Sequence, residues 1–239
     1  MVESACERVR QVAILDVETT GLNPSTDRCI EVAVMLYDLE RASPVASFAS
    51  LIQGEAANAA QYANGIDPVL LPDARPADTV WRAVRWLIAP AQAVVAHRAS
   101  FDSQFVPDLG KPWVCSKTSI RWPDKKRGDH LVQLALSLGL GVASAHRAMA
   151  DVDTLARILT RVAEMGHCLP DLFADAMRPK VRLYSLAPFE QKDVVKSHGF
   201  LWDPSKKVWW RDMPPEDADE LPFQVSPDPW GLQPAKAQP

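Results

Sequence analysis

Three strongly apolar stretches follow one another at the start of the sequence, and this order constrains the fold more than any other feature. They are QVAILDVE (11–18), CIEVAVMLYD (29–38) and VASFASLIQ (45–53), all rich in Val, Ile, Leu or Ala. Turn residues such as Gly21 and Pro44 separate them. Short apolar runs divided by Gly, Asn and Pro are typical of strands joined by turns. We therefore expect three consecutive strands of one sheet.

Helices and strands alternate in the residues that follow. Apolar residues recur at helical spacing between Asp78, which can cap a helix, and Pro90, which would end it. The run AVVA (93–96) has the composition of a short buried strand. Two further helical patterns end at Gly139 and near Gly166. The order predicts a domain of the α/β class.

Composition limits what the chain can be. Hydrophobic residues make up 47% and charged residues 23%, which is close to the average for globular proteins and argues against extensive disorder. The net charge of −4 means that any binding of nucleic acid must be local. No segment has the ~18 apolar residues of a membrane span, and charged residues occupy the N-terminus, where a secretory signal would need an apolar stretch. Because the four cysteines also lack paired spacing, we expect a cytoplasmic protein with reduced thiols.

Candidate chemistry lies at three points along this framework. Asp16 and Glu18 are two residues apart on the first expected strand, so both side chains leave the same face of the sheet and favour a cation. Asp102 lies at the start of a short helix. His146 precedes Asp151, which lies on the first turn of another helix. Taken singly, a strand end in solvent, helix capping and an ordinary polar histidine explain these residues more simply.

Taken together, the three segments resemble the motifs of the DnaQ-like, or DEDDh, exonuclease family within the ribonuclease H-like fold. The first motif is similar to residues 16–22 (DVETTGL), the second to residues 97–102, and the third to His146 and Asp151 in H-x4-D spacing. The likeness covers roughly residues 10–165. It implies a mixed sheet flanked by helices.

The resemblance also implies an activity: metal-dependent 3′–5′ hydrolysis of DNA or RNA that releases nucleoside 5′-monophosphates. Hard cations such as Mg²⁺ prefer oxygen ligands, and a carboxylate cluster can hold two of them, with Mn²⁺ as a possible substitute. His146 would take the proton of the attacking water. The implied catalytic residues, of which the four carboxylates are also the metal ligands, are Asp16, Glu18, Asp102, His146 and Asp151.

Contacts to the substrate are implied at residues beside these motifs. They are Thr20, Gly21, Leu22, Ile66, Arg98 and Phe101. Leu22 and Ile66 would press against the terminal base, although loop packing explains either one equally well. Arg98 stands where the family commonly has Asn, and Asn64 where His is usual, so substrate preference is less well defined than the reaction class. Residues 116–128, with five basic residues and Trp122, suit either a strand-guiding surface or a solvated loop.

The composition changes after the catalytic domain, which we expect to span residues 1–168. Residues 169–179 predict a linker or a short connecting helix. Residues 180–221 predict a small basic, Trp-rich βαββ module, an α+β unit that resembles modules with the pattern G-x-x-W-D-x-x-x-K-x-W in bacterial nucleic-acid proteins. Residues 222–239 are rich in proline and are expected to be disordered.

The C-terminal module carries charge and aromatic rings that suit nucleic acid. Residues 178–211 contain eight basic and three acidic residues, together with Trp202, Trp209 and Trp210. Because alternate residues of a hairpin face opposite sides, Trp202 and one of the other two are expected to pack the small core. The outward ring could stack on a base, so we expect the module to tether the enzyme to nucleic acid.

Three functions follow from these patterns. The first is a freestanding exonuclease that trims single-stranded 3′ ends in DNA repair, recombination or RNA turnover. The second is a proofreading subunit bound to a polymerase. The third is a non-catalytic nucleic-acid-binding protein, which would have no need of His146. The choice between DNA and RNA and a possible homodimer are left open, and no membrane partner is expected.

Overall fold

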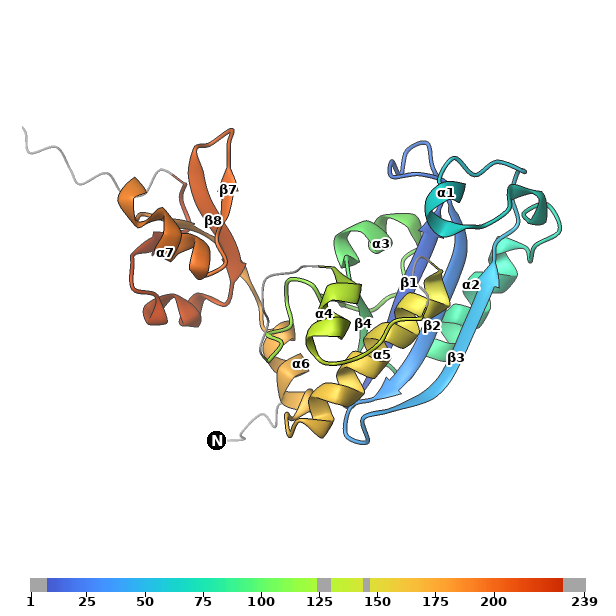
Figure 1. Cartoon of the computed structure of the whole chain (residues 1–239), viewed down its shortest axis with the longest axis horizontal. Helices are drawn as coiled ribbons and strands as arrows, with labels where there is room; N and C mark the ends of the chain where they lie inside the picture. Colours follow the sequence, from blue (N-terminus) through green and yellow to red (C-terminus); the bar gives the residue numbers. More distant parts are fainter. Residues whose placement is uncertain (1–7, 124–129, 144–146, 230–239) are drawn as a thin grey trace, which may run out of the picture. The chain divides into compact units, whose positions relative to one another are not determined.

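The computed structural model describes residues 8–123, 130–143 and 147–229. It divides into two compact units, Met1–Met177 and Arg178–Pro239 (Figure 1). Within the described ranges no helix has the length and apolar character needed to cross a membrane.

A mixed five-stranded sheet forms the centre of the first unit. Its strands are β1 (Gln11–Thr19), β2 (Cys29–Asp38), β3 (Ser43–Leu51), β4 (Ala93–Ala96) and β5 (Trp113–Cys115). The first three pair antiparallel, whereas β4 pairs parallel to β1 and β5 parallel to β4, in the order β3-β2-β1-β4-β5. The expected three-strand start and the buried strand at 93–96 are both confirmed.

Helices cover both faces of this sheet (Figure 1). On β1, Val12 and Ile14 belong to the core cluster that includes α5 (Ala148–Glu164), while Ala13 and Leu15 belong to the cluster that includes α2 (Ala77–Ile88). The alternation follows from the two-residue period of a strand. The remaining helical segments of the first unit are α1 (Gln61–Asn64), η1 (Pro68–Leu70), α3 (Ala99–Phe105), α4 (Leu131–Ser137) and α6 (Leu169–Met177).

One expectation about the helices was wrong. Asp78 does not cap α2, because Pro76 is at the N-cap and Asp78 lies within the first turn. Of the two alternatives for residues 169–179, a linker or a short helix, the structure has the helix α6, and its Leu169 and Phe173 are buried in the same core as α5. The first unit therefore extends beyond residue 168, to Met177.

The second unit is a small sheet with one short helix. Its elements are β6 (Val181–Ser185), η2 (Phe189–Gln191), α7 (Lys192–Ser197), β7 (Leu201–Asp203), β8 (Val208–Met213), η3 (Pro215–Glu220) and β9 (Val225–Ser226). The sheet order is β7-β8-β6-β9, so the expected βαββ arrangement is present with one strand more. Because β9 pairs with β6, the expectation of disorder was wrong for this part of the tail. Residues 230–239 lie outside the described residues.

Acidic residues within and after β8 neutralise part of the basic charge of the second unit. Arg178 contacts Asp217 at 2.7 Å, and Arg182 contacts Asp212 at 2.8 Å. The guanidinium of Arg182 also lies 3.9 Å from the ring centre of Trp210. The net positive surface expected from residues 178–211 is thus weakened, because the acids come from the same folded unit.

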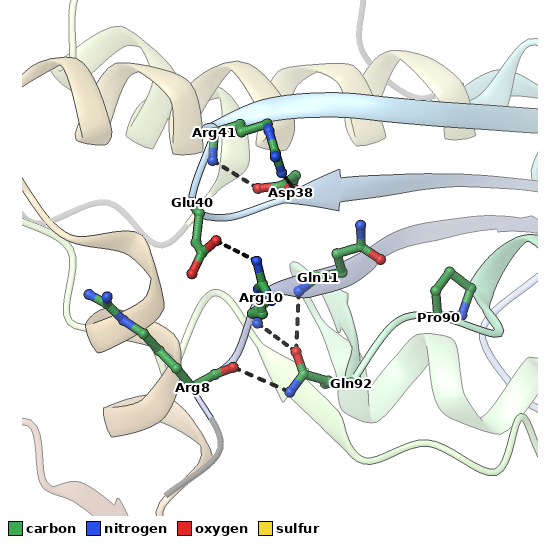
Figure 2. Close-up of a pocket in the computed structure, with 8 residues that line it drawn as sticks. All are labelled: Arg8, Arg10, Gln11, Asp38, Glu40, Arg41, Pro90 and Gln92. Carbon is green, nitrogen blue, oxygen red and sulfur yellow. Dashed lines mark hydrogen bonds and ion pairs between the residues drawn. The ribbon is translucent and has the colours of Figure 1, made fainter. Parts of the chain in front are cut away.

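The sheet of the first unit has a hollow at the end where β1 begins and β2 finishes. Figure 2 shows this cavity, of about 710 Å³ and lined by Arg8, Arg10, Gln11, Asp38, Glu40, Arg41, Pro90 and Gln92. Arg41 contacts Asp38 at 2.7 Å, and Arg10 contacts Glu40 at 3.0 Å. Both carboxylates of the cavity are therefore held by arginines.

Candidate active site

Three carboxylates meet at the opposite end of β1. Asp16 and Glu18 continue the strand face on which Val12 and Ile14 pack toward α5. Asp151 lies in the first turn of α5. One oxygen from each of Asp16, Glu18 and Asp151 lies within 4.8 Å of the other two. The structure thus brings together three residues that are far apart in sequence.

Asp102 reaches the same region from α3. Its side chain is almost fully buried, with 3% of the residue exposed. A backbone hydrogen bond from Val17 on β1 lowers the pKa of Asp102, although burial raises it more. Asp102 lies beside the group of three without belonging to it.

His146 lies outside the described residues. The next residue, Arg147, is described and forms the N-cap of α5. The role of His146 as general base therefore stays a prediction from its spacing to Asp151.

The acidic side chains at this end raise one another's pKa. Burial, followed by the charges of Asp102 and Asp151, holds the pKa of Asp16 well above its ordinary range. Burial is also the first cause for Glu18, whose pKa rises to about 7, and for Asp102, whose pKa rises to about 7. Desolvated like charges destabilise a fold unless protons or cations compensate them. Because all the donors are carboxylate oxygens, the group fits a hard divalent cation.

The loop that follows β1 is held in shape by Asp27. Its carboxylate accepts hydrogen bonds from the Thr20 hydroxyl (3.3 Å) and from the backbone N–H of Asn23 (2.8 Å). A Cβ atom on Gly21 would come within 2.5 Å of this carboxylate, so the close approach requires glycine. Leu22 is 80% exposed. It is available for contact with a ligand, as the resemblance implies.

Ile66 has a different environment from Leu22. It is 2% exposed and packs with Ile30 and Leu71, so the expected contact with a base is not available to its side chain in this structure. Asn64 is also buried; its amide donates to the Thr19 carbonyl (3.1 Å) and accepts from the Ile66 N–H (3.1 Å). An amide can do both at once. This pair of residues ties the loop to the end of β1.

Arg98 and Phe101 lie at the start of α3. Arg98 is exposed, and its guanidinium is 5.7 Å from the ring centre of Phe101. Phe101 is half-buried and packs against Phe105, with ring centres 4.9 Å apart. Arg98 thus offers a cation next to Asp102, whose pKa its charge lowers.

The basic segment after β5 is partly structural. Trp122 is buried, and its indole N–H donates to the carbonyl of Ser116 at 2.7 Å. Arg121 contacts Asp175 of α6 at 3.4 Å. Residues 124–129, which include Lys125, Lys126 and Arg127, lie outside the described residues.

Sequence reasoning missed three residues that shape this end of the sheet. Asp27 orders the loop that carries Leu22, while Glu31 and Arg147 join β2 to the start of α5. A signal was present for Glu31, because it is a charged residue inside the apolar run CIEVAVMLY.

Each of the two units contains a segment that matches a known protein family. A family model described as "Exonuclease" matches residues 13–108, and a domain family of unknown function matches residues 185–227. The DNA polymerase III subunit epsilon of Treponema pallidum is 28% identical over 177 residues, covering 64% of this chain and 79% of its own length. The PolC-type DNA polymerase III of Thermotoga petrophila is 29% identical over 164 residues, which are 64% of this chain and 12% of that protein. This chain thus matches only a small part of the PolC relative.

Solved structures share the fold. Exonuclease X in complex with 5′ overhanging duplex DNA superposes with a TM-score of 0.55 at 22% identity, covering 69% of this chain and 99% of that one. The nuclease domain of 3′hExo, a DEDDh family member bound to rAMP, gives a TM-score of 0.57 at 18% identity, covering 68% and 95%. With the family match and the epsilon relative, these likenesses show that residues 13–108 are similar to exonuclease domains and that the first unit has the fold of solved exonucleases.

Proposed function

We propose that this chain is a metal-dependent exonuclease that hydrolyses the terminal phosphodiester at the 3′ end of single-stranded DNA or RNA and releases nucleoside 5′-monophosphates. The observation that carries the proposal is the convergence of Asp16, Glu18 and Asp151 within 4.8 Å, with Asp102 beside them. A structural role alone does not explain four acidic side chains gathered at one strand end.

The four carboxylates would hold the metal. A bound divalent cation supplies Lewis acidity and counter-charge for the phosphodiester. Exposed Leu22 can contact the terminal nucleotide, and Asp27 keeps its loop in shape. Arg98 can bind a substrate phosphate. His146 would take the proton from the attacking water, as its spacing to Asp151 predicts.

The proposal extends to the identity of the metal ion, the number of ions bound per site and the cellular location of the protein. We infer Mg²⁺ as the ion, with two bound per site and Mn²⁺ able to substitute, because the donors are oxygens and four acids are available. A cytoplasmic location is supported by Cys29, Cys115 and Cys168, which are free thiols. The assays below distinguish single-stranded from duplex substrates, and a monomer from a homodimer.

Product analysis tests the proposal directly. Purified protein with Mg²⁺ is incubated with 5′-labelled single-stranded DNA, single-stranded RNA and duplexes, and the products are separated at single-nucleotide resolution. We expect a ladder that shortens from the 3′ end and disappears in EDTA. Internal cuts, or full activity in chelator, would contradict the proposal. Size-exclusion chromatography with light scattering separates monomer from homodimer.

A second candidate role is proofreading within a polymerase complex. It is favoured by two of the sequence relatives, which are a DNA polymerase III subunit and a PolC-type polymerase. Affinity purification of the tagged chain from its own cells tests this role. Stoichiometric recovery of a polymerase would support it, and faster removal of mismatched than of matched primer ends would be the functional sign.

A further inference from the structure

Glu31 is a buried carboxylate in the middle strand pair of the sheet. It is 5% exposed, and on β2 it lies directly opposite Glu18 of β1. Its Oε2 accepts a hydrogen bond from Nε of Arg147 at 3.0 Å, and its Oε1 accepts one from Nη2 at 2.6 Å. This two-point contact fixes both the distance and the orientation of the two groups.

The same carboxylate also caps α5. The N-cap residue Arg147 makes no side-chain capping bond, but Oε2 of Glu31 accepts the backbone N–H of Ala148 at 3.2 Å. The first N–H groups of a helix need such acceptors, and a negative charge is favourable at this end. A residue of β2 thus supplies the cap of a helix that begins 117 positions later in the sequence.

We propose that Glu31 and Arg147 form a positioning clamp that sets the separation of Asp151 from Asp16 and Glu18. The clamp connects the two elements that carry the carboxylates, β1 and α5. Glu31 lies opposite Glu18 of β1, and Asp151 lies one helical turn after Arg147. It also holds the residue next to His146. The inference rests on the proposed function only where kcat and KM are measured, because these constants need the exonuclease reaction.

Glu31 acts behind the site and does not serve as a further metal ligand. Both of its oxygens already accept hydrogen bonds from Arg147, and one also accepts the Ala148 N–H. Its negative charge therefore has its own cation, although it lies close to other carboxylates. Residues that orient metal ligands in this way typically change metal affinity or activity by about 10–100-fold when they are replaced.

The chain offers a matched control at the other end of the same strand. Asp38 is 6% exposed and accepts hydrogen bonds from Nη1 of Arg41 (2.7 Å) and from the backbone N–H of Arg41 (2.8 Å). It is also a buried carboxylate with an arginine and a backbone donor, but it lies in the cavity of Figure 2, away from Asp16. Asp38→Asn therefore measures the effect of losing such a pair on stability alone.

The test uses the full chain with Glu31→Gln, Arg147→Met, Arg147→Lys, the Glu31→Gln/Arg147→Met double variant, and Asp38→Asn. Mg²⁺ and Mn²⁺ are titrated while kcat, KM for a short oligonucleotide and Tm are measured. We expect Glu31→Gln and Arg147→Met each to raise the half-saturating metal concentration by about tenfold and to lower kcat by about 10–100-fold, with KM changed less than threefold. Arg147→Lys should retain more activity than Arg147→Met.

Two further results distinguish a clamp from general destabilisation. The double variant should be no worse than the poorer single variant, because both changes remove one interaction. Asp38→Asn should lower Tm as Glu31→Gln does, while its metal response and kcat stay within twofold of wild type. If Asp38→Asn shifts the metal response equally, or if the two single effects add, the clamp is refuted.

The measurements of Tm against metal concentration test the clamp independently of exonuclease activity. If wild-type protein cleaves no substrate but its Tm rises with Mn²⁺, the proposed function fails, and the clamp is still judged by the metal concentration at which Tm rises in each variant. If Glu31→Gln does not fold, Arg147→Met decides the outcome, because the Arg147 side chain is half-exposed. An unchanged metal response in that variant overturns the clamp.

Discussion

The carboxylates at the two ends of the five-stranded sheet have opposite environments. Where β1 begins, Asp38 is bound by Arg41 and Glu40 by Arg10. Where β1 ends, Asp16 and Glu18 lie close to Asp151, so that acids face acids. The pKa values diverge accordingly: although burial raises the pKa of Asp38, hydrogen bonds from Arg41 lower it overall, whereas burial and like charges raise that of Asp16.

We infer from this difference that Asp38 and Glu40 serve stability, whereas Asp16, Glu18 and Asp151 serve a ligand. A carboxylate that has its own arginine helps to hold the chain together and needs nothing from outside. A group of carboxylates pressed against one another costs stability in the absence of a cation and persists where it has a function. Substitutions of single acids at the two ends of the sheet test this contrast.

The largest effect is expected from replacing Asp16. Asp16→Asn should reduce turnover at least about a hundredfold if the residue binds the metal that activates the reaction. The Tm of the metal-free variant should equal or exceed that of wild type, because one of the repelling charges is gone. Asp38→Asn should do the reverse, keeping turnover and losing about 1–3 kcal/mol of unfolding free energy. Oligonucleotide cleavage and denaturant unfolding measure both, and a lower Tm for metal-free Asp16→Asn would break the contrast.

Removal of the proposed general base should have the next largest effect. His146→Ala is expected to lower kcat on the order of 10²-fold, in the lower part of the usual range for such residues. Because the imidazole is not a metal ligand in this proposal, Mg²⁺ should still raise Tm as it does for wild type. Near-normal turnover, or loss of the metal response, would show that His146 has another role.

The two ends should also respond to pH in opposite directions. The folded-state pKa of Glu18 is raised from 4.5 to about 7, so the folded metal-free protein binds more protons than the unfolded chain between these values. Stability from this group is therefore fully present below about pH 4.5 and is lost as pH rises through about 7. The pKa of Asp38 is lowered, so its contribution is present at neutral pH and is lost in acid.

Unfolding experiments with EDTA across the pH range check these signs. Glu18→Gln should flatten the loss of stability toward pH 7, and Asp38→Asn should flatten the loss in acid. Mg²⁺ should raise Tm more at pH 8 than at pH 5.5, because it binds the ionised carboxylates. An equal response to Mg²⁺ at both values would argue against metal binding by these acids.

The smallest effect is expected from the second unit, which we propose tethers the enzyme to long strands. The expectation that Trp202 packs the small core was wrong: Trp209 packs against that core, whereas Trp202 is 43% exposed with its ring centre 5.4 Å from that of Trp209. Because Arg182 covers Trp210, Trp202 is the ring that we expect to contact a base. Trp202→Ala should weaken binding to long single strands by about 1–3 kcal/mol and leave kcat on short oligonucleotides unchanged. A chain that ends at Met177 should show the same weakening with a shallower salt dependence. Unchanged affinity in both would indicate a protein-binding or structural unit.

Much of the fold could be predicted because local sequence determines it. The strands β1, β2 and β4 are buried, and the high content of apolar residues in these short runs already predicted this. The sequence left a linker or a short helix open for residues 169–179, and α6 forms there because Pro170 lies in its first turn, where the missing N–H removes no bond. β9 has two residues and no pattern of its own, since it forms only by pairing with β6.

The site could be predicted only where neighbouring residues carry the information. The spacing of Asp16 and Glu18 specifies one strand face. Nothing local indicates that Glu31 meets Arg147, because the two are 116 positions apart and only the packing of α5 on the sheet joins them. A linear count of charge likewise failed for the second unit, where acids beyond residue 211 fold back onto its arginines.

The loop between β1 and β2 has an evolutionary consequence. It takes its shape from hydrogen bonds among its own residues around Asp27, and Leu22 projects from it into solvent. Replacements at Leu22 can therefore be tried by natural variation, or by a laboratory library, without disturbing the strand that carries Asp16 and Glu18. Under the proposed contact of Leu22 with the terminal nucleotide, descendants of such a protein can acquire new substrate preferences while they keep the carboxylates of β1.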